Sequence, residues 1–368
     1  MFLARRELRY AWGRFALMGS VIALVAVLTV MLSGLATGLV DDGISGLRAL
    51  PVSHLAFQAR TDSTFSRSTI DVATIEQLNK TNGVRAEPLG LSLFNARSSA
   101  ANVTVDLALM GLQPGGFVAA DVVHGSLPDA ASNGVIITQG LADSGVHIGD
   151  RLSFDRSKTV LTVVGIAPKS TYGHVDVAYT ALPVWQVATY NALDATAATK
   201  LVSSAAIVAD AGVDTAALAK SADLDIVTKT AAFNGSPGYA AETSTMTLIR
   251  GFLYVIAAMI LGAFFTVWTI QRRAEIGLQK ALGASNRAVL LDALGQVLIV
   301  LVGATAVGVV IGLALGALIS GGSVPFSLQA GPVTGASITL IVAGVMGMLV
   351  GIRRITSVDP IIALEGSR

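Results

Sequence analysis

Four long stretches of apolar residues, separated by more polar segments, dominate the hydropathy pattern of the chain. They occupy residues 15–40, 246–270, 288–319 and 333–352. A helix of about 20 apolar residues crosses the roughly 30 Å hydrocarbon core of a bilayer, so each stretch is long enough to span it. The first stretch is longer than the roughly 7–15 apolar residues of a signal-peptide core, which predicts a retained helix instead of a cleaved leader.

The segment between the first two stretches, residues 41–244, has the pattern of a folded domain. Alternating or β-branched runs predict strands at residues 86–97, 103–112, 134–139, 159–168 and 205–210. Residues 70–84 have the spacing of an amphipathic helix that ends at Gly83, and residues 234–242 are predicted to be a flexible link. The predicted fold class is therefore a membrane α-helical protein with four transmembrane helices and an inserted α+β extracytoplasmic domain between helices 1 and 2.

Basic residues predict the orientation of these helices. They cluster in three segments: Arg5, Arg6, Arg9 and Arg14; Arg272, Arg273, Lys280 and Arg287; Arg353, Arg354 and Arg368. Because cytoplasmic loops carry an excess of Lys and Arg, residues 1–14, 271–287 and 353–368 are predicted to be cytoplasmic. Residues 320–332 carry no charge and are predicted to form an outer loop. The pattern indicates a multi-pass protein of the cell membrane with both termini in the cytoplasm.

Composition and missing motifs exclude several classes of protein. The net charge of +1 suggests no nucleic-acid partner, and the absence of cysteine excludes disulfides and thiolate chemistry. The chain has no GxxxxGK[ST] phosphate-binding loop, no HExxH and no GxSxG, so no catalytic residue is predicted. Its four histidines, His54, His124, His147 and His174, have no ligand spacing and are interpreted as surface or packing residues. Energy for transport would have to come from a partner or an ion gradient.

The cytoplasmic segment 271–287 contains the most distinctive local pattern. Its apolar Ile276 and Leu282 alternate with charged Glu275 and Lys280 as in a short amphipathic helix, and Gly283 would end it. The pattern alone leaves two interpretations open: a solvated turn that fixes topology, or a docking element for a soluble partner.

The same segment carries a family resemblance. Glu275-Ile276-Gly277 followed by Lys280-Ala281-Leu282-Gly283 resembles the signature of ABC permeases of the FtsX and MacB type. The tail Arg353-Arg354-Ile355 with Asp359-Pro360 matches the same family, and the order of spans is also similar. The resemblance is weak in the outer domain, which is shorter than a typical MacB domain. The resemblance implies that residues 275–277 and 280–283 dock an ABC ATPase subunit that binds ATP and Mg²⁺. It also implies that two copies of the chain form a homodimer that binds two such subunits.

A second resemblance concerns the cargo. Phe2-Leu3-Ala4-Arg5-Arg6-Glu7-Leu8 and the later run 33–39, with a compact outer domain, resemble haem-exporting permeases of the HrtB type. This resemblance implies haem as a transported ligand taken from the outer leaflet between two copies of the chain, with no permanently bound cofactor. The rival functions are a mechanotransmitter for peptides or lipids, a regulator of a cell-wall hydrolase, and a receptor or structural membrane protein.

Residues at the start of the second span form a candidate haem site. Glu242, Met246 and Arg250 share one helix face, and Tyr239 precedes them. Glu242 is predicted to ligate the haem iron, the only metal contact expected, with Met246 as a second contact. Arg250 is predicted to pair with a haem propionate. The alternatives are that Glu242 only stabilises the helix N-terminus and that Arg250 snorkels to the interface.

A GxxxG pair lies in the first span. Gly34 and Gly38 allow another backbone to approach closely. Packing within the chain and contact with a second copy are both left open by the sequence.

Overall fold

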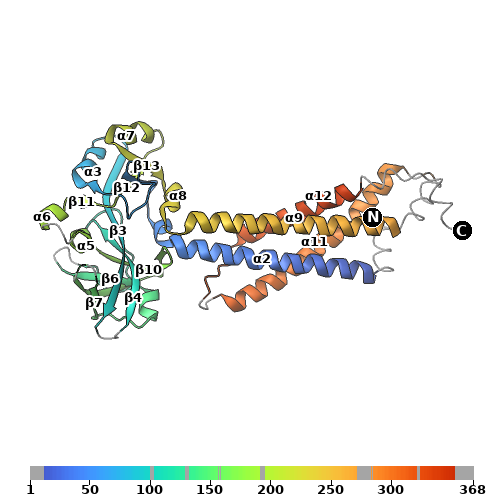
Figure 1. The fold of residues 1–368 in the computed structure, drawn as a ribbon, viewed down its shortest axis with the longest axis horizontal. Helices are drawn as coiled ribbons and strands as arrows, with labels where there is room; N and C mark the ends of the chain where they lie inside the picture. The colour runs from blue at the N-terminus through green and yellow to red at the C-terminus, as the bar shows by residue number, and fades with distance from the viewer. Residues whose placement is uncertain are drawn as a thin grey trace. The chain divides into compact units, whose positions relative to one another are not determined.

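The computed structural model describes residues 12–99, 103–128, 132–155, 157, 159–190, 195–271, 283, 285–320 and 324–352. The chain forms two compact units (Figure 1). The helical unit comprises Met1–Leu39 and Ser244–Arg368, and the sheet unit comprises Val40–Thr243. The predicted N-terminal segment 1–14 and tail 353–368 lie largely or wholly outside the described residues.

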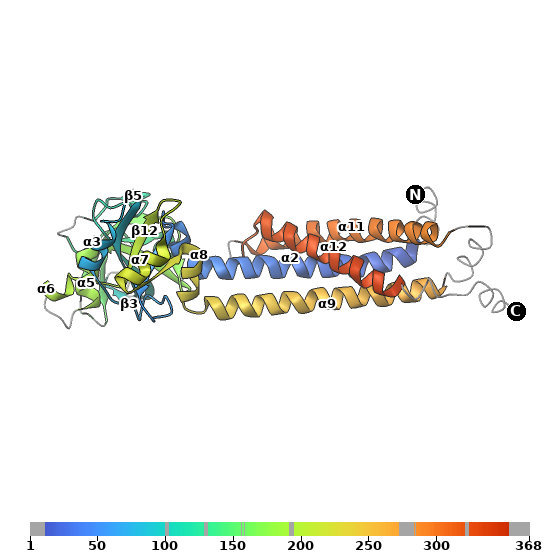
Figure 2. The same cartoon turned by 90° about the horizontal axis from the view of Figure 1, so that it is seen from above.

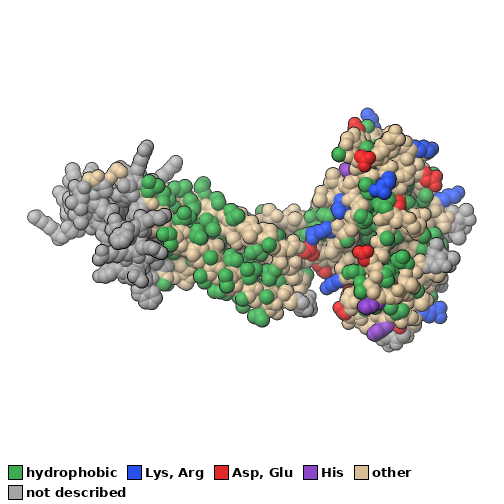
Figure 3. All heavy atoms as spheres, turned by 180° about the vertical axis from the view of Figure 1, so that it is seen from behind, with side chains coloured by type: hydrophobic (Ala, Val, Ile, Leu, Met, Phe, Trp, Pro, Cys, Tyr) green, Lys and Arg blue, Asp and Glu red, His purple; other side chains and the backbone are tan. Residues whose placement is uncertain are grey.

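In the part of the chain that the structure describes, the helical unit is built from four long helices, which lie along one another in Figure 2. They are α2 (Trp12–Ala49), α9 (Tyr239–Gln271), α11 (Asn286–Ile319) and α12 (Ala330–Ile352). All four are long and apolar enough to cross a membrane. Their surface in Figure 3 is covered with hydrophobic side chains, whereas the charged side chains in that view gather on the sheet unit.

The helices pack through small apolar clusters and through glycines. Side chains from all four helices meet in the larger cluster: Met18, Ile22, Leu261, Leu301 and Met348. Close approach depends on residues without a side chain, because a β-carbon at Gly347 would lie under 3.0 Å from the backbone of Ala258. A β-carbon at Gly308 would meet the backbone of Ala23 just as closely. Small residues therefore set the spacing of these helices.

The GxxxG pair of α2 is covered by the loop between α11 and α12. β-carbons at Gly34 and Gly38 would lie under 3.0 Å from Phe326 and Pro325, respectively. The backbone N–H of Ser327 also donates a hydrogen bond to the carbonyl oxygen of Gly34, at 3.1 Å. The pair thus serves packing within the chain.

The sheet unit contains thirteen strands among the residues that the structure describes. The bounds are β1 His54–Gln58, β2 Ile70–Asp71, β3 Val84–Ser98, β4 Thr104–Leu112, β5 His124–Gly125, β6 Gly134–Thr138, β7 Arg151–Phe154, β8 Val160–Ala167, β9 Thr171–Tyr172, β10 Val175–Ala181, β11 Leu201–Val202, β12 Ser204–Ala209 and β13 Leu224–Thr228. The helices are α3 Val72–Leu78, α4 Gln139–Asp143, α5 Leu182–Thr189, α6 Ala195–Ala198, α7 Thr215–Ala222 and α8 Lys229–Ala232, with a 3-10 turn at Phe233–Gly235.

Six strands pair in a closed circuit. The order is β3, β4, β10, β6, β8, β7 and back to β3, with β4–β10 and β6–β8 parallel and the other pairs antiparallel. The first half of β3 instead pairs with β12 and extends the sheet through β1 to β13. The long strand β3 therefore belongs to both the closed circuit and the open sheet.

Two apolar cores stabilise the sheet unit. One lies inside the circuit and against α3 and α5, and its largest fully buried side chains include Trp185 and Phe154. The other packs Ile44 and Leu47 of α2 against the sheet, next to Phe57. The spacing of Ile44 and Leu47 puts both on one helix face, which explains why α2 continues past residue 40 into this core.

Three local features differ from the sequence prediction. The helix predicted over residues 70–84 is shorter in the structure. It begins at Val72, after the N-cap Asp71, and ends at Leu78. Gly83 instead forms a turn at φ +78°. The segment 234–242, predicted to be a flexible link, contains the first turn of α9 from Tyr239. No glycine or proline stands between Gly238 and Gly251, and an acidic residue in the first turn, Glu242, favours a helix.

Candidate functional site

The candidate site residues on α9 begin with Glu242, which lies in the first turn of the helix. Its carboxylate Oε1 is 2.9 Å from Nε2 of His174. The other ring nitrogen of His174, Nδ1, is 3.1 Å from Oδ2 of Asp42 on α2. One imidazole is therefore placed between two carboxylates within the sheet unit.

The backbone around His174 explains its position. His174 and Gly173 form the turn between β9 and β10, with φ of +66° and +59°, respectively. Histidine is among the residues that adopt this left-handed region more often than most. The N–H of Gly173 donates to the carbonyl oxygen of Gly43 at 2.8 Å. The N–H of Thr171 donates to Oγ of Ser45 at 2.8 Å, so the turn is attached to α2 at several points.

The electrostatics of this cluster favour a charged imidazole. Burial by itself lowers the pKa of His174. The hydrogen bonds and negative charges of Asp42 and Glu242 outweigh burial and raise the pKa of His174 above its usual value. Only the protonated ring has an N–H on both nitrogens, so only that form donates to both carboxylates. The described residues contain no group of three side chains that is suited to hold a metal ion.

Arg250 lies two turns along α9 from Glu242, within the helical unit. Its Nη2 donates a hydrogen bond of 3.4 Å to the backbone carbonyl oxygen of Ser33 on α2. Its Nε is buried and, like the buried Oγ of Ser33, has no hydrogen-bond partner in the described part of the chain. No carboxylate among these residues lies within ion-pair distance of Arg250. A guanidinium without a counter-ion in an apolar helix is costly and suits an anionic ligand.

The remaining candidates differ in their surroundings. Met246, one turn from both Glu242 and Arg250, is half-buried. The ring of Tyr239 lies edge-on to Phe233 at 6.0 Å between centroids and packs against a core of the sheet unit. This packing accounts for Tyr239 without a ligand, and its contact with haem stays a prediction.

The predicted ATPase-docking segment is almost entirely beyond the described residues. This holds for Glu275, Ile276, Gly277, Lys280, Ala281 and Leu282. Gly283 is described, and it is exposed with φ +93°, a conformation that favours glycine.

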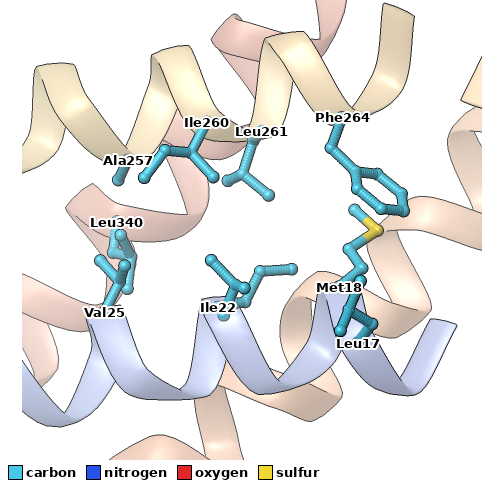
Figure 4. A pocket seen from close by; sticks show the side chains of 10 residues that line it. Leu17, Met18, Ile22, Val25, Ala257, Ile260, Leu261, Phe264 and Leu340 are labelled. Carbon is cyan, nitrogen blue, oxygen red and sulfur yellow. The ribbon is translucent and has the colours of Figure 1, made fainter. Parts of the chain in front are cut away.

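An apolar cavity of about 60 Å³ lies between α2 and α9 (Figure 4). Ten apolar residues line it: Leu17, Met18, Val21, Ile22, Val25, Ala257, Ile260, Leu261, Phe264 and Leu340. None of the four haem-site candidates lines it, and it offers no polar group to a ligand. The cavity suits only a small apolar group such as part of a lipid acyl chain.

Sequence reasoning missed His174 and Asp42 as members of the site. His174 was interpreted as a surface or packing residue, and it has a specific position between two carboxylates instead. The left-handed turn at Gly173–His174 was a weak local signal, because a glycine beside a histidine suits such a turn. The partners, however, are 132 and 68 positions away in the sequence.

Comparison with known proteins finds a family match in the C-terminal helices. Residues 247–360 match the FtsX-like permease C-terminal family. The match includes most of α9 and all of α11 and α12, together with the predicted docking segment.

Proteins that are similar over the full length of the chain are also known. A protein of Staphylococcus haemolyticus (strain JCSC1435), named as a hemin transport system permease protein HrtB, is 24% identical over 100% of this chain and 99% of its own. A protein of the same name from Staphylococcus epidermidis (strain ATCC 35984) is 23% identical over 100% of both chains. The extracellular domain of the noncanonic ABC-type transporter YknZ from Gram-positive bacteria is a structural neighbour. It shares 15% identity, covers 46% of this chain and 88% of that one, and has a TM-score of 0.33.

Proposed function

We propose that this chain is the permease subunit of an ABC-type exporter that extracts haem from the outer leaflet of the membrane and releases it outside. The observation that carries the proposal is Arg250, which follows Glu242 by two helical turns and has no carboxylate partner among the described residues. The two side chains are two helical turns apart on the same face of α9. Haem matches this pair chemically, because it has a ferric centre and two carboxylates on one amphipathic ring.

Glu242 ligates the haem iron in this proposal. It stands at the start of α9, and its side chain is 26% exposed, so a ligand can reach it. Met246, one turn further, provides a thioether as a second contact, and axial ligands of this kind determine how haem is held. Tyr239 flanks the site. Haem is the transported ligand here, and no permanent cofactor is proposed.

Arg250 binds a haem propionate in this proposal. Its present hydrogen bond goes to a neutral backbone oxygen, and its Nε is buried without a partner in the described residues. A carboxylate from the ligand would replace this weak contact with a charge-assisted one, which contributes about 1.5–3 kcal/mol. The low dielectric around α9 strengthens that contact further.

The same proposal includes the orientation of the chain in the membrane and the subunits of the transporter. The sheet unit lies outside the cell membrane, and both termini lie in the cytoplasm, as the basic residues indicate. Two copies of the chain form a homodimer with two ATPase subunits, and haem enters laterally from the lipid. The family match and the hemin transport names of the full-length relatives support this arrangement.

A haem titration tests the cargo. Purified protein is expected to shift the Soret band of added haem, and Glu242→Ala is expected to weaken binding about tenfold or more, the equivalent of about 1.4 kcal/mol. Arg250→Met, which keeps the length but removes the charge, is expected to weaken it to a similar extent. Glu76→Ala is the control, because Glu76 is an exposed acid of the sheet unit far from α9 in sequence.

Absence of haem binding by the unaltered protein would contradict this function. The FtsX-like match would then favour the second candidate, a mechanotransmitter that acts on peptides, lipids or a cell-wall hydrolase. Equal affinity of Glu242→Ala and Glu76→Ala would keep haem as cargo and remove Glu242 from the site.

A substitution in the predicted docking segment tests whether a separate ATPase subunit binds to the chain there. Leu282→Glu places a charge in the apolar contact expected for the ATPase, so the ATP-hydrolysing partner is expected to be lost during purification from native membranes. Haem affinity should stay within about twofold, because no haem-site residue is altered. Gln279→Ala is the matched control in the same segment. Retention of the partner by Leu282→Glu would exclude docking through this residue.

A further inference from the structure

His174 gives the candidate iron ligand a fixed direction. Glu242 is not a freely rotating acid, because its Oε1 already lies 2.9 Å from Nε2 of His174. No described residue hydrogen-bonds to Oε2, the second carboxylate oxygen. The hydrogen bond therefore engages one oxygen of the carboxylate and leaves the other available to a ligand.

We propose that His174 is a positioning residue that orients the Glu242 carboxylate for the iron of the cargo. The inference rests on the proposed function, since it assumes that Glu242 meets haem. His174 itself does not contact the iron. Partners that hydrogen-bond to a ligating carboxylate fix its orientation, and their loss typically weakens metal binding by about 10–100-fold.

The attachments of the turn make His174 suitable for this role. Nδ1 is held by Asp42 at 3.1 Å, so the ring cannot rotate without breaking a second contact. The preceding residue, Gly173, is bonded to Gly43 of α2. A β-carbon at Gly43 would lie 3.7 Å from the imidazole, in ordinary contact distance, so α2 also limits the ring from one side. The imidazole is thus held in place by α2 and can act as a fixed donor to the Glu242 carboxylate.

A purely structural role for His174 makes a different prediction from a positioning role. The backbone of His174 is left-handed, and asparagine tolerates this conformation better than glutamine or alanine. If His174 only maintained the turn, His174→Asn would be the mildest substitution. A glutamine amide reaches about as far as Nε2 and can donate to Glu242, whereas an asparagine amide reaches only about as far as Nδ1 and Asp42.

The experiment compares three substitutions of His174 in the full-length protein. Haem affinity is measured by Soret titration, and the axial ligand is monitored through the ligand-sensitive absorption bands of bound ferric haem. We expect His174→Gln to stay within about threefold of the unaltered protein. His174→Asn and His174→Ala are expected to bind about 10–100-fold more weakly, with shifted bands. His147→Gln, an exposed histidine of the sheet unit, is the control.

The outcomes separate the inference from the proposed function. If the unaltered protein binds no haem, both fail. If it binds haem through Glu242 but His174→Asn equals or exceeds His174→Gln, the function stands and the positioning role is overturned. Unchanged affinity and spectra in all three variants would overturn it equally. Thermal unfolding of each variant identifies any loss of fold, and the comparison of His174→Gln with His174→Asn still decides the case if His174→Ala does not fold.

Discussion

Replacing Gly90 by alanine is expected to destabilise the sheet unit by about 3 kcal/mol or more, the upper end for an overpacked core. A β-carbon at Gly90 would lie under 3.0 Å from the indole of Trp185, which is fully buried. Gly90 is in the middle of β3 and pairs with β4, so the backbone has little room to move away. Gly111→Ala should be as damaging, because its β-carbon would lie 2.5 Å from Cβ of Trp185.

The two glycine variants should respond differently to a second substitution. Trp185→Leu removes the indole atoms that Gly90→Ala meets, so the Gly90→Ala/Trp185→Leu protein is expected to be more stable than the sum of its single changes predicts. Trp185→Leu leaves Cβ in place and should not rescue Gly111→Ala. Hydrogen exchange of peptides from β3 and β4 in the purified protein measures both effects. Equal rescue of the two glycine variants would contradict this account.

Replacing Gly38 by alanine is expected to displace the loop between α11 and α12 and to lower the stability of the helical unit by about 1–3 kcal/mol. The added β-carbon would lie under 3.0 Å from the backbone carbonyl group of Pro325, which cannot rotate away. Gly34→Ala should be milder, since its β-carbon would meet the far end of the Phe326 ring. Both changes strain the hydrogen bond from Ser327 to Gly34.

Protease sensitivity of the loop and thermal unfolding in detergent measure this effect. Gly303→Ala is the matched control, because nothing lies within 4 Å of its added β-carbon and it also lies on a long apolar helix. Gly303→Ala is expected to be neutral or slightly stabilising, as alanine is the better helix former. The packing interpretation would be wrong if Gly38→Ala and Gly303→Ala behaved alike.

The helical unit was predictable from the sequence because membrane insertion depends on local composition. Any run of about 20 apolar residues is a candidate span, whatever its partners. The sheet unit was predictable only in part. Strands such as β4 and β8 have clear alternation, but β10, with the sequence VDVAYTA, gave no signal strong enough to be predicted and yet pairs with both β4 and β6. Strand order depends on contacts between distant segments, which local patterns do not contain.

In the candidate site, too, local relations were predictable and contacts between distant segments were not. Glu242 and Arg250 share a face by helical periodicity, so the sequence alone placed them together. His174 reaches Glu242 only because β9 and β10 return to α2 and α9, and no spacing in the sequence reports that return. The missing carboxylate partner of Arg250 was equally invisible, since it depends on which acids the fold brings near.

The closed circuit of strands has a consequence for how the protein is made. Strand β3 is one member of this circuit, which is complete only when β10 has joined β4 and β6, and β10 ends at Ala181. Contacts between such distant segments form slowly, because the intervening chain must close first. If the sheet unit is exported while the chain is being synthesised, all residues from the end of β3 at Ser98 to Ala181 must emerge before the circuit can close. Until then, the edge of β4 that pairs with β10 is free, and a folding helper on the far side of the membrane would find its substrate there.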